Sequence, residues 1–245
     1  MTKNTGITQY FGANLAELLS DKILKVYANF PKDKYVQTIK NESEGLSYTH
    51  RIELHAEVLK SCLPENFDEA VSILLKILGD ENANETGMFS EYYWIMPIGK
   101  YVEQYGIEHF DTSINAIEEI TKRNTGEYAI RPFIRAYPDK TLAKMKGWAK
   151  SDNFHLRRIA SEGLRPKLPW ATKLETFLNH PAPVFEILDI LKEDEIMFVK
   201  KSVANHLTDW LKVNKEAAFD LISAWQKSNN KHTQWIIKRA TRKIK

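Results

Sequence analysis

A repeated octapeptide is the feature that most limits how this chain can fold. Residues 148–155 read WAKSDNFH and residues 225–232 read WQKSNNKH, so the pattern W-x-K-S-[DN]-N-x-H recurs after 77 residues. Each copy precedes a basic segment with helical apolar spacing, LRRIASEGL after the first and WIIKRATRKI after the second. Serine, aspartate and asparagine favour turns and helix N-caps. Each octapeptide therefore predicts a turn that leads into a helix.

A third, more divergent segment lies about halfway between the two copies. Residues 190–207 read ILKEDEIMFVKKSVANHL, and their Val199-Lys200-Lys201 parallels Leu156-Arg157-Arg158. The repeat length is then roughly 38 residues with one insertion, which is typical of helix–turn–helix units stacked as in HEAT or armadillo arrays.

The rest of the chain also favours helices. Segments with helical apolar spacing cover residues 14–27, 50–62, 67–78, 92–105 and 113–122, and a further helix is expected to open at Thr125-Gly126-Glu127 and run into Arg131-Pro132. No segment alternates long enough to indicate a sheet. We expect an all-α fold, an α-solenoid (superhelix) of HEAT-like helical repeats, as a single domain over residues 1–245.

Composition excludes several classes of protein. Cys62 is the only cysteine, so an internal disulfide or a cysteine-based zinc cluster is impossible, and a reducing compartment fits. No apolar run approaches the roughly 20 residues of a membrane helix, and the N-terminal residues lack the order of a signal peptide. We expect a cytoplasmic protein with no membrane partner.

Metal and nucleotide chemistry find no support in the motifs. His50 and His55 flank Glu53 without forming the H-E-x-x-H spacing of a zinc protease. The chain also lacks the glycine-rich phosphate-binding loops and the G-x-S-x-G motif of serine hydrolases. We expect no metal and no cofactor.

Basic side chains gather in two segments. Residues 131–173 carry 11 basic and 3 acidic side chains, and residues 226–245 carry 7 basic and none acidic. The segment between them, residues 174–225, carries 5 basic and 9 acidic side chains. If the chain doubles back, the two basic segments line a concave groove suited to a phosphate backbone. The alternative is two separate, solvated basic helices.

Residues 154–170, FHLRRIASEGLRPKLPW, combine several unusual features. Arg158, Glu162 and Arg165 fall at i, i+4 and i+7, so a carboxylate is expected between two guanidiniums. Proline disrupts helices, so Pro166 is expected to end this one and leave Trp170 outside the helical core. The simpler interpretation is a helix cap with an ordinary surface ion pair.

A second glutamate is expected near Glu162. The segments GEYAIRPF and SEGLRPKL both place a glutamate shortly before Arg-Pro, and their Glu127 and Glu162 are 35 residues apart. One repeat length brings equivalent positions of neighbouring units to the same surface, so the two carboxylates are predicted to converge. Alternatively, both are charges at helix ends.

The segment HLRRIASEGLRPKLPWA, with GEYAIRPF before it and SVANHLTDWLK and WIIKRATRKI after it, resembles the AlkC branch of the AlkC/AlkD DNA alkylation repair glycosylases. The resemblance runs from about Trp94 to the C-terminus and continues more weakly through IELHAEVLKSCLPENFDEAVSIL. It implies HEAT-like repeats and an enzyme that excises cationic N-alkylated bases, of the 3-methyladenine and 3-methylcytosine type, from double-stranded DNA. It also implies hydrolysis without a cofactor and without full base flipping. Some members carry a C-terminal immunoglobulin-like domain, and we expect none within residues 1–245.

The resemblance also assigns site residues. It implies that Glu162 is the catalytic carboxylate, that Asp209 and Glu127 are acidic positions lining the same site, and that Trp170 packs against the damaged nucleotide. It implies that Arg158 and Arg165 bind the DNA near the lesion. Further candidates for DNA contact are Arg157, Arg131, Lys167, Lys201 and Arg239.

Two departures from the family pattern are visible. The family usually reads N-N-L-N-D where this chain reads NHLTD at residues 205–209, and it usually has histidine where Arg239 stands. Asp209 is retained, so the acidic group of this block is present.

The residue types suit the reaction that the resemblance implies. An N-alkylated base is cationic and leaves readily, while the sugar acquires positive charge in an oxocarbenium-like state. A carboxylate stabilises that charge and orients water, and an indole attracts the cationic base. We expect a monomer. Two other hypotheses remain, a catalytically silent protein that binds distorted DNA and a HEAT-type scaffold for other proteins.

Overall fold

The computed structural model describes residues 6–87 and 89–242, and every regular element in these ranges is a helix. The all-α prediction is confirmed. The chain divides into two compact units. The first unit comprises residues 1–82 and 87–125, and the second comprises residues 83–86 and 126–245. A single domain and one continuous concave groove stay predictions.

The first unit contains seven α-helices and two short 3-10 helices within the described residues. They are η1 (Ile7–Tyr10), α1 (Ala13–Leu24), α2 (Lys32–Glu42), α3 (Tyr48–Cys62), α4 (Phe67–Lys76), α5 (Phe89–Tyr92), η2 (Tyr93–Ile95), α6 (Met96–Tyr105) and α7 (Phe110–Thr121). The segments expected at 14–27, 50–62, 67–78, 92–105 and 113–122 correspond to α1, α3, α4, α6 and α7. Helix α2 was not predicted, because only Tyr35 and Ile39 of its eleven residues are buried and its apolar face is narrow.

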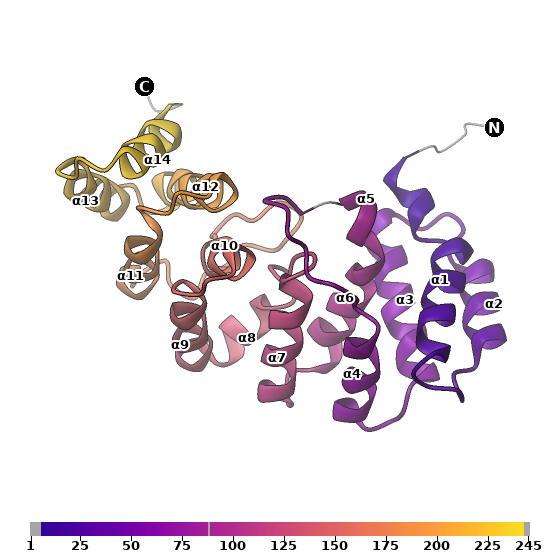
Figure 1. The fold of residues 1–245 in the computed structure, drawn as a ribbon. Coiled ribbons are helices and arrows are strands. Elements are labelled where there is room, and N and C mark those ends of the chain that lie inside the picture. Colours follow the sequence, from indigo (N-terminus) through magenta and orange to yellow (C-terminus); the bar gives the residue numbers. More distant parts are fainter. Residues whose placement is uncertain (1–5, 88, 243–245) are drawn as a thin grey trace. The chain divides into compact units, whose positions relative to one another are not determined.

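The second unit contains α8 (Arg131–Ala136), α9 (Pro138–Trp148), α10 (Phe154–Glu162), α11 (Ala182–Leu191), α12 (Met197–Val213), α13 (Lys215–Gln226) and α14 (Lys231–Thr241). Helix α12 packs against both α10 and α14, and α13 packs against α12 and α14 (Figure 1). Helices α10, α12 and α14 thus pack against their counterparts in the adjacent repeats, as helical repeats do.

The repeated octapeptide adopts the predicted turn and cap in both copies. The Ser151 hydroxyl accepts from the Asn153 amide at 3.1 Å, and the Ser228 hydroxyl accepts from the Asn230 amide at 3.1 Å. The side chains of Asn153 and Asn230 then cap α10 and α14. Each cap satisfies amides that the first turn of a helix leaves unpaired.

The middle repeat uses a different residue for the same turn. Asp194 accepts from the backbone amide of Ile196 at 2.9 Å, as the serines do from the residue two positions on. Asp194 lies 43 residues after Ser151 and 34 residues before Ser228. The insertion expected from the repeat length therefore lies in the first interval, which contains the connection between α10 and α11 (residues 163–181).

Two expected helix boundaries are wrong. The helix expected to open at residues 125–127 begins at Arg131 instead, because Pro132 suits the first turn of a helix, where no amide partner is needed. Glu127 therefore lies in a turn. Helix α10 ends at Glu162, before Pro166, so Arg165 follows the helix rather than belonging to it.

Candidate functional site

Five charged side chains form a continuous chain of ion pairs in the second unit. An Arg158 Nη1 donates to Glu127 Oε2 at 2.6 Å, and its Nη2 lies 3.8 Å from Glu162 Oε1. The Nη1 of Arg165 donates to the same Glu162 oxygen at 2.6 Å, and its Nε donates to Asp209 Oδ2 at 2.8 Å. Acid and base alternate along the chain, which we call the acid–arginine chain.

Three separate parts of the second unit supply the acid–arginine chain. Arg158 and Glu162 lie one turn apart on α10, and Arg165 follows the end of that helix. Glu127 comes from the turn before α8, and Asp209 comes from α12. The predicted placement of Glu162 between two guanidiniums is confirmed, and so is the convergence of Glu127 and Glu162, which both contact Arg158.

Glu162 is kept ionised although it is only 6% exposed. Burial alone would raise the pKa of this carboxyl, but the guanidiniums of Arg158 and Arg165 and a hydrogen bond from Ser202 outweigh burial and hold the pKa below its usual value. Glu162 is therefore a desolvated carboxylate at neutral pH.

Ser202 belongs to this site and was not predicted. Its hydroxyl donates to Glu162 Oε2 at 2.5 Å from a buried position on α12. Ser202 precedes Asp209 by seven residues, so both side chains lie on the same face of the helix. The seven-residue spacing from Asp209 is visible in the sequence, but it does not indicate that Ser202 contacts Glu162.

The acid–arginine chain carries an excess of acidic groups. Burial raises the pKa of Asp209, and the hydrogen bond and charge of Arg165 offset this only in part. Burial alone would lower the pKa of Arg158, but Glu127 and Glu162 raise it, so that guanidinium stays charged. Three carboxyl groups thus face two guanidiniums, an arrangement that suits a cationic ligand.

Trp170 lies outside the core, as predicted. It is 86% exposed, and it follows Pro169 in the connection between α10 and α11. Its φ of 58° makes it the only non-glycine residue with positive φ in the part of the chain that the structure describes. Such a conformation is costly for a large side chain and is retained where surrounding contacts enforce it.

Arg131 does not lie where a phosphate contact requires it. Its side chain is 2% exposed, and its guanidinium donates to the carbonyl oxygens of Gly163, Arg165 and Thr172. Burial and the nearby guanidiniums of Arg135 and Arg165 lower the pKa of Arg131 to about 10, so it remains a cation at neutral pH. The expected DNA contact by Arg131 does not fit this placement, because the side chain is buried and both terminal nitrogens already bind backbone carbonyl groups.

Arg157 also makes internal contacts. It donates from Nε to Asp194 at 2.6 Å and from Nη1 to the carbonyl oxygens of Ser151 and Asp152, each at 2.9 Å. These bonds connect the turn before α10 to the turn before α12. Contact of Arg157 with DNA stays a prediction.

The remaining predicted DNA-binding residues are accessible to different degrees. Lys167 and Lys201 are exposed, whereas Arg239 is partly buried with its guanidinium carbon 5.4 Å from the centre of the Trp235 ring. Contact of these three residues with DNA stays a prediction.

Neither metal ligands nor membrane helices are found among the described residues. Residues 6–87 and 89–242 contain no group of three or more His, Cys, Asp or Glu side chains that could hold a metal ion. His55 is buried and hydrogen bonded to the Tyr35 hydroxyl at 2.7 Å, and burial lowers its pKa to about 3. Within the same ranges, no helix has the length and apolar character needed to cross a bilayer.

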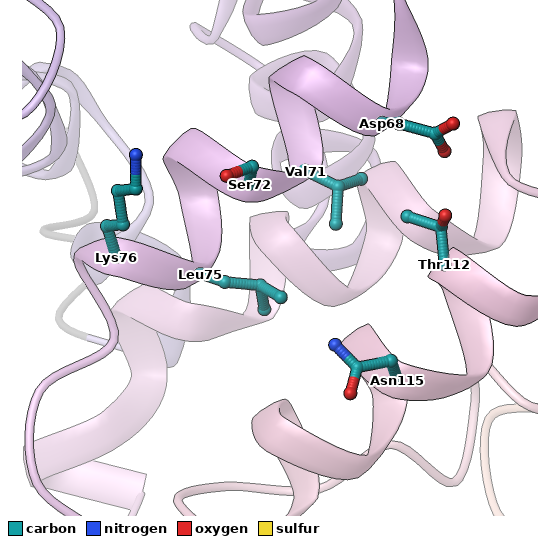
Figure 2. A pocket seen from close by; sticks show the side chains of 7 residues that line it. All are labelled: Asp68, Val71, Ser72, Leu75, Lys76, Thr112 and Asn115. Carbon is teal, nitrogen blue, oxygen red and sulfur yellow. The ribbon is translucent and has the colours of Figure 1, made fainter.

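The first unit has a surface hollow of about 460 Å³. Figure 2 shows the side chains that line it, which come from α4 and α7: Asp68, Val71, Ser72, Leu75, Lys76, Thr112 and Asn115. None of the predicted site residues lines this hollow, and it contains no histidine, cysteine or tyrosine.

Comparisons with known proteins place these features in context. The model of a family described as DNA alkylation repair enzyme matches residues 107–244. A Bacillus subtilis (strain 168) protein, "Uncharacterized protein YhaZ", is 32% identical over 239 residues, which cover 97% of this chain and 64% of that protein. The structure of Pseudomonas fluorescens alkylpurine DNA glycosylase AlkC bound to DNA containing an abasic site analog is similar, with a TM-score of 0.85 and 31% identity. That match covers 96% of this chain and 63% of AlkC, so the chain spans just under two thirds of each relative.

Proposed function

The chain belongs to the DNA alkylation repair enzyme family, as the sequence resemblance predicted, and on this premise we propose that it is a DNA glycosylase. Its proposed substrates are cationic N-alkylated bases in double-stranded DNA, of the 3-methyladenine and 3-methylcytosine type. The proposed reaction is hydrolysis of the N-glycosidic bond. The DNA-bound state of AlkC supports DNA as the partner of this chain.

The observation that carries the proposal is the ionised, buried Glu162 at the centre of the acid–arginine chain. Departure of a cationic base leaves positive charge on the sugar. A preorganised carboxylate stabilises that charge more strongly than water does, because a site closed to solvent screens it less. Glu162 is 6% exposed and fixed by contacts to both of its oxygens, so it needs no reorganisation during the reaction.

Asp209 and Glu127 are proposed to assist Glu162 from either end of the acid–arginine chain. Each contacts a guanidinium that also contacts Glu162. A carboxylate in this position adds to the negative potential and is able to orient the attacking water. Asp209 is suited to orienting the water, because its pKa is raised. The pKa of Glu162, the other carboxyl group that contacts Arg165, is lowered.

Trp170 is proposed to contact the damaged nucleotide. An exposed indole face attracts a cationic base by about 0.5–2 kcal/mol, depending on how far water is excluded. The ring is available for this contact because it is not used in the core. Arg158 and Arg165 both form ion pairs with carboxylates. We therefore propose that their main role is to position these carboxylates. Contact of the two arginines with DNA stays a prediction.

The decisive experiment is incubation of the protein with methylated duplex DNA, with release of 3-methyladenine and 3-methylcytosine measured separately. The Glu162→Gln variant keeps the shape of the side chain and removes its charge, so it should bind the DNA and release base roughly 10²–10³-fold more slowly. Glu186→Gln is the matched control, since Glu186 forms an exposed ion pair with Lys146 in the same unit.

The same experiment separates the other two hypotheses. A catalytically silent DNA-binding protein binds methylated DNA but releases no base even in its wild-type form. A scaffold for other proteins shows neither release nor salt-dependent DNA binding. Wild-type release rates in Glu162→Gln would exclude Glu162 from the mechanism. Reaction without full base flipping, a monomeric state and a cytoplasmic location belong to the same proposal.

A further inference from the structure

Trp170 is presented by a closed loop of nine residues. We call residues 166–174 the Trp170 loop. The Leu174 amide donates to the Pro166 carbonyl oxygen at 3.0 Å, which closes the loop at its base. Within it, the Ala171 amide donates to Leu168, and the Tyr128 hydroxyl donates to the Pro169 carbonyl oxygen at 3.3 Å. The exposed Trp170 ring lies near the middle of this loop.

A single buried guanidinium joins the two sides of the loop. On the side that enters it, Arg131 Nη1 donates to the carbonyl oxygens of Gly163 at 3.2 Å and Arg165 at 3.0 Å. On the returning side, Arg131 Nη2 donates to the Thr172 carbonyl oxygen at 2.6 Å. Because a guanidinium is planar and rigid, these bonds fix the two sides relative to each other.

We propose that Arg131 is a positioning residue that holds Trp170 in the orientation needed to contact the damaged nucleotide. This inference rests on the proposed function, which assigns that contact to Trp170. Arg131 also binds the backbone of Arg165, whose side chain holds Glu162 and Asp209. One guanidinium therefore sets the position of the Trp170 loop relative to the acid–arginine chain.

The backbone conformation of Trp170 shows why the loop needs the hydrogen bonds from Arg131. A bulky residue with φ of 58° relaxes to a more favourable conformation unless neighbouring contacts prevent it. Lysine cannot replace Arg131, because its ammonium is a single point charge. It cannot bind carbonyl groups on both sides of the loop with fixed geometry.

Arg131→Lys tests the proposal, with Arg135→Lys as its matched control. Arg135 lies one turn further along α8 and contacts only the returning side, through the Thr172 hydroxyl at 2.7 Å and the Lys173 carbonyl oxygen at 3.3 Å. We expect Arg131→Lys to slow single-turnover release of 3-methyladenine about three- to thirtyfold, as loss of one cation–π contact does. Hydrogen–deuterium exchange of residues 163–174 should become faster in the same variant. Arg135→Lys should change both quantities less than about twofold.

A double-mutant cycle with Trp170→Ala distinguishes positioning from general stabilisation. If Arg131 acts through Trp170, Arg131→Lys causes little further slowing once the indole is gone. Equal slowing in both backgrounds, or unchanged exchange of the Trp170 loop, would overturn the proposal. So would unfolding of both Arg131→Lys and Arg131→Gln, since Arg131 would then be a folding residue. Failure of the wild-type protein to release any base would instead remove the proposed function, and the catalytic part of this inference with it.

Discussion

The Ser202 hydroxyl donates a 2.5 Å hydrogen bond to Glu162 Oε2 and so connects α12 to the last residue of α10. This bond favours the ionised form of Glu162, together with the guanidiniums that contact the other oxygen. The state of the proposed catalytic acid therefore depends on a residue from the next repeat.

Ser202→Ala should move the acidic limb of the pH–rate profile to higher pH. The variant removes a donor to the carboxylate, which raises the pKa of Glu162. Base release requires the ionised form, so it is lost as pH falls through that pKa, and in the variant this loss begins at a higher pH. Single-turnover rates across the pH range measure the limb, and Ser202→Thr, which keeps the hydroxyl, should leave it in place.

Trp170→Ala should leave the melting temperature nearly unchanged and slow base release. The ring is 86% exposed, so its removal creates no cavity. Trp210→Ala is the contrasting variant, because Trp210 is buried and its loss should cost roughly 3–5 kcal/mol. Thermal unfolding and single-turnover release are measured on both variants. A destabilisation of Trp170→Ala equal to that of Trp210→Ala would make Trp170 structural.

DNA affinity should fall steeply with salt if Lys167, Lys201 and Arg239 neutralise phosphates. Each lost phosphate contact reduces the slope of log K against log salt by about 0.9. We therefore expect Lys167→Gln, Lys201→Gln and Arg239→Gln each to flatten the slope by about this amount. Lys40→Gln, at an exposed position in the first unit, is the control and should not change it. An unchanged slope for one of the three variants would remove that residue from the DNA contact.

Gly163→Ala should destabilise the second unit. An added Cβ would lie 2.8 Å from Ile130 Cγ2 and 3.1 Å from Met145 Cε, in a close-packed part of the core. Overpacking of this kind typically costs about 1–3 kcal/mol. Gly147→Ala is the control, because nothing lies within 4 Å of its added Cβ, and alanine within α9 should stabilise by roughly 0.5–1 kcal/mol. Denaturant unfolding should show that the free energy of unfolding decreases in Gly163→Ala and increases in Gly147→Ala.

His206 should make the protein less stable as pH falls below neutrality. Burial lowers its pKa to about 3, so between pH 3 and 6.5 the unfolded chain binds a proton that the folded protein does not. The free energy of unfolding then decreases as pH falls, by roughly 2 kcal/mol between pH 7 and pH 5 for this one group. His206→Asn should reduce that loss by the same amount, whereas His180→Asn, at an exposed position, should not.

The parts of the fold that the sequence predicted are those governed by local chemistry. The turn at Ser151 and the caps at Asn153 and Asn230 depend on neighbouring residues only, so their pattern is visible in the chain. The placement of Glu162 beside Arg158 follows from helical spacing. Helix α2 lacked a broad apolar face, so its packing against α1 and α3, rather than its own pattern, defines it.

The parts that could not be predicted depend on contacts between distant residues. Arg131 and Thr172 are 41 positions apart, and no local pattern indicates that one binds the carbonyl group of the other. Arginine in a basic segment normally indicates a solvated or phosphate-binding side chain, and burial of its guanidinium became evident only in the folded structure. Ser202 shares the seven-residue spacing of Asp209, but a lone serine in a helix gives no indication of its partner.

The unequal intervals of 43 and 34 residues between equivalent turns have a consequence for recognition. A perfectly regular array presents the same surface at every step, just as duplex DNA presents the same backbone at every step. Two periodic surfaces can bind each other in many registers and so cannot single out one nucleotide. The longer interval, from Ser151 to Asp194, contains both Glu162 and the Trp170 loop, so it gives the array one unique position. Under the proposed function, this irregularity gives a repetitive protein one position at which it can act on a single damaged nucleotide.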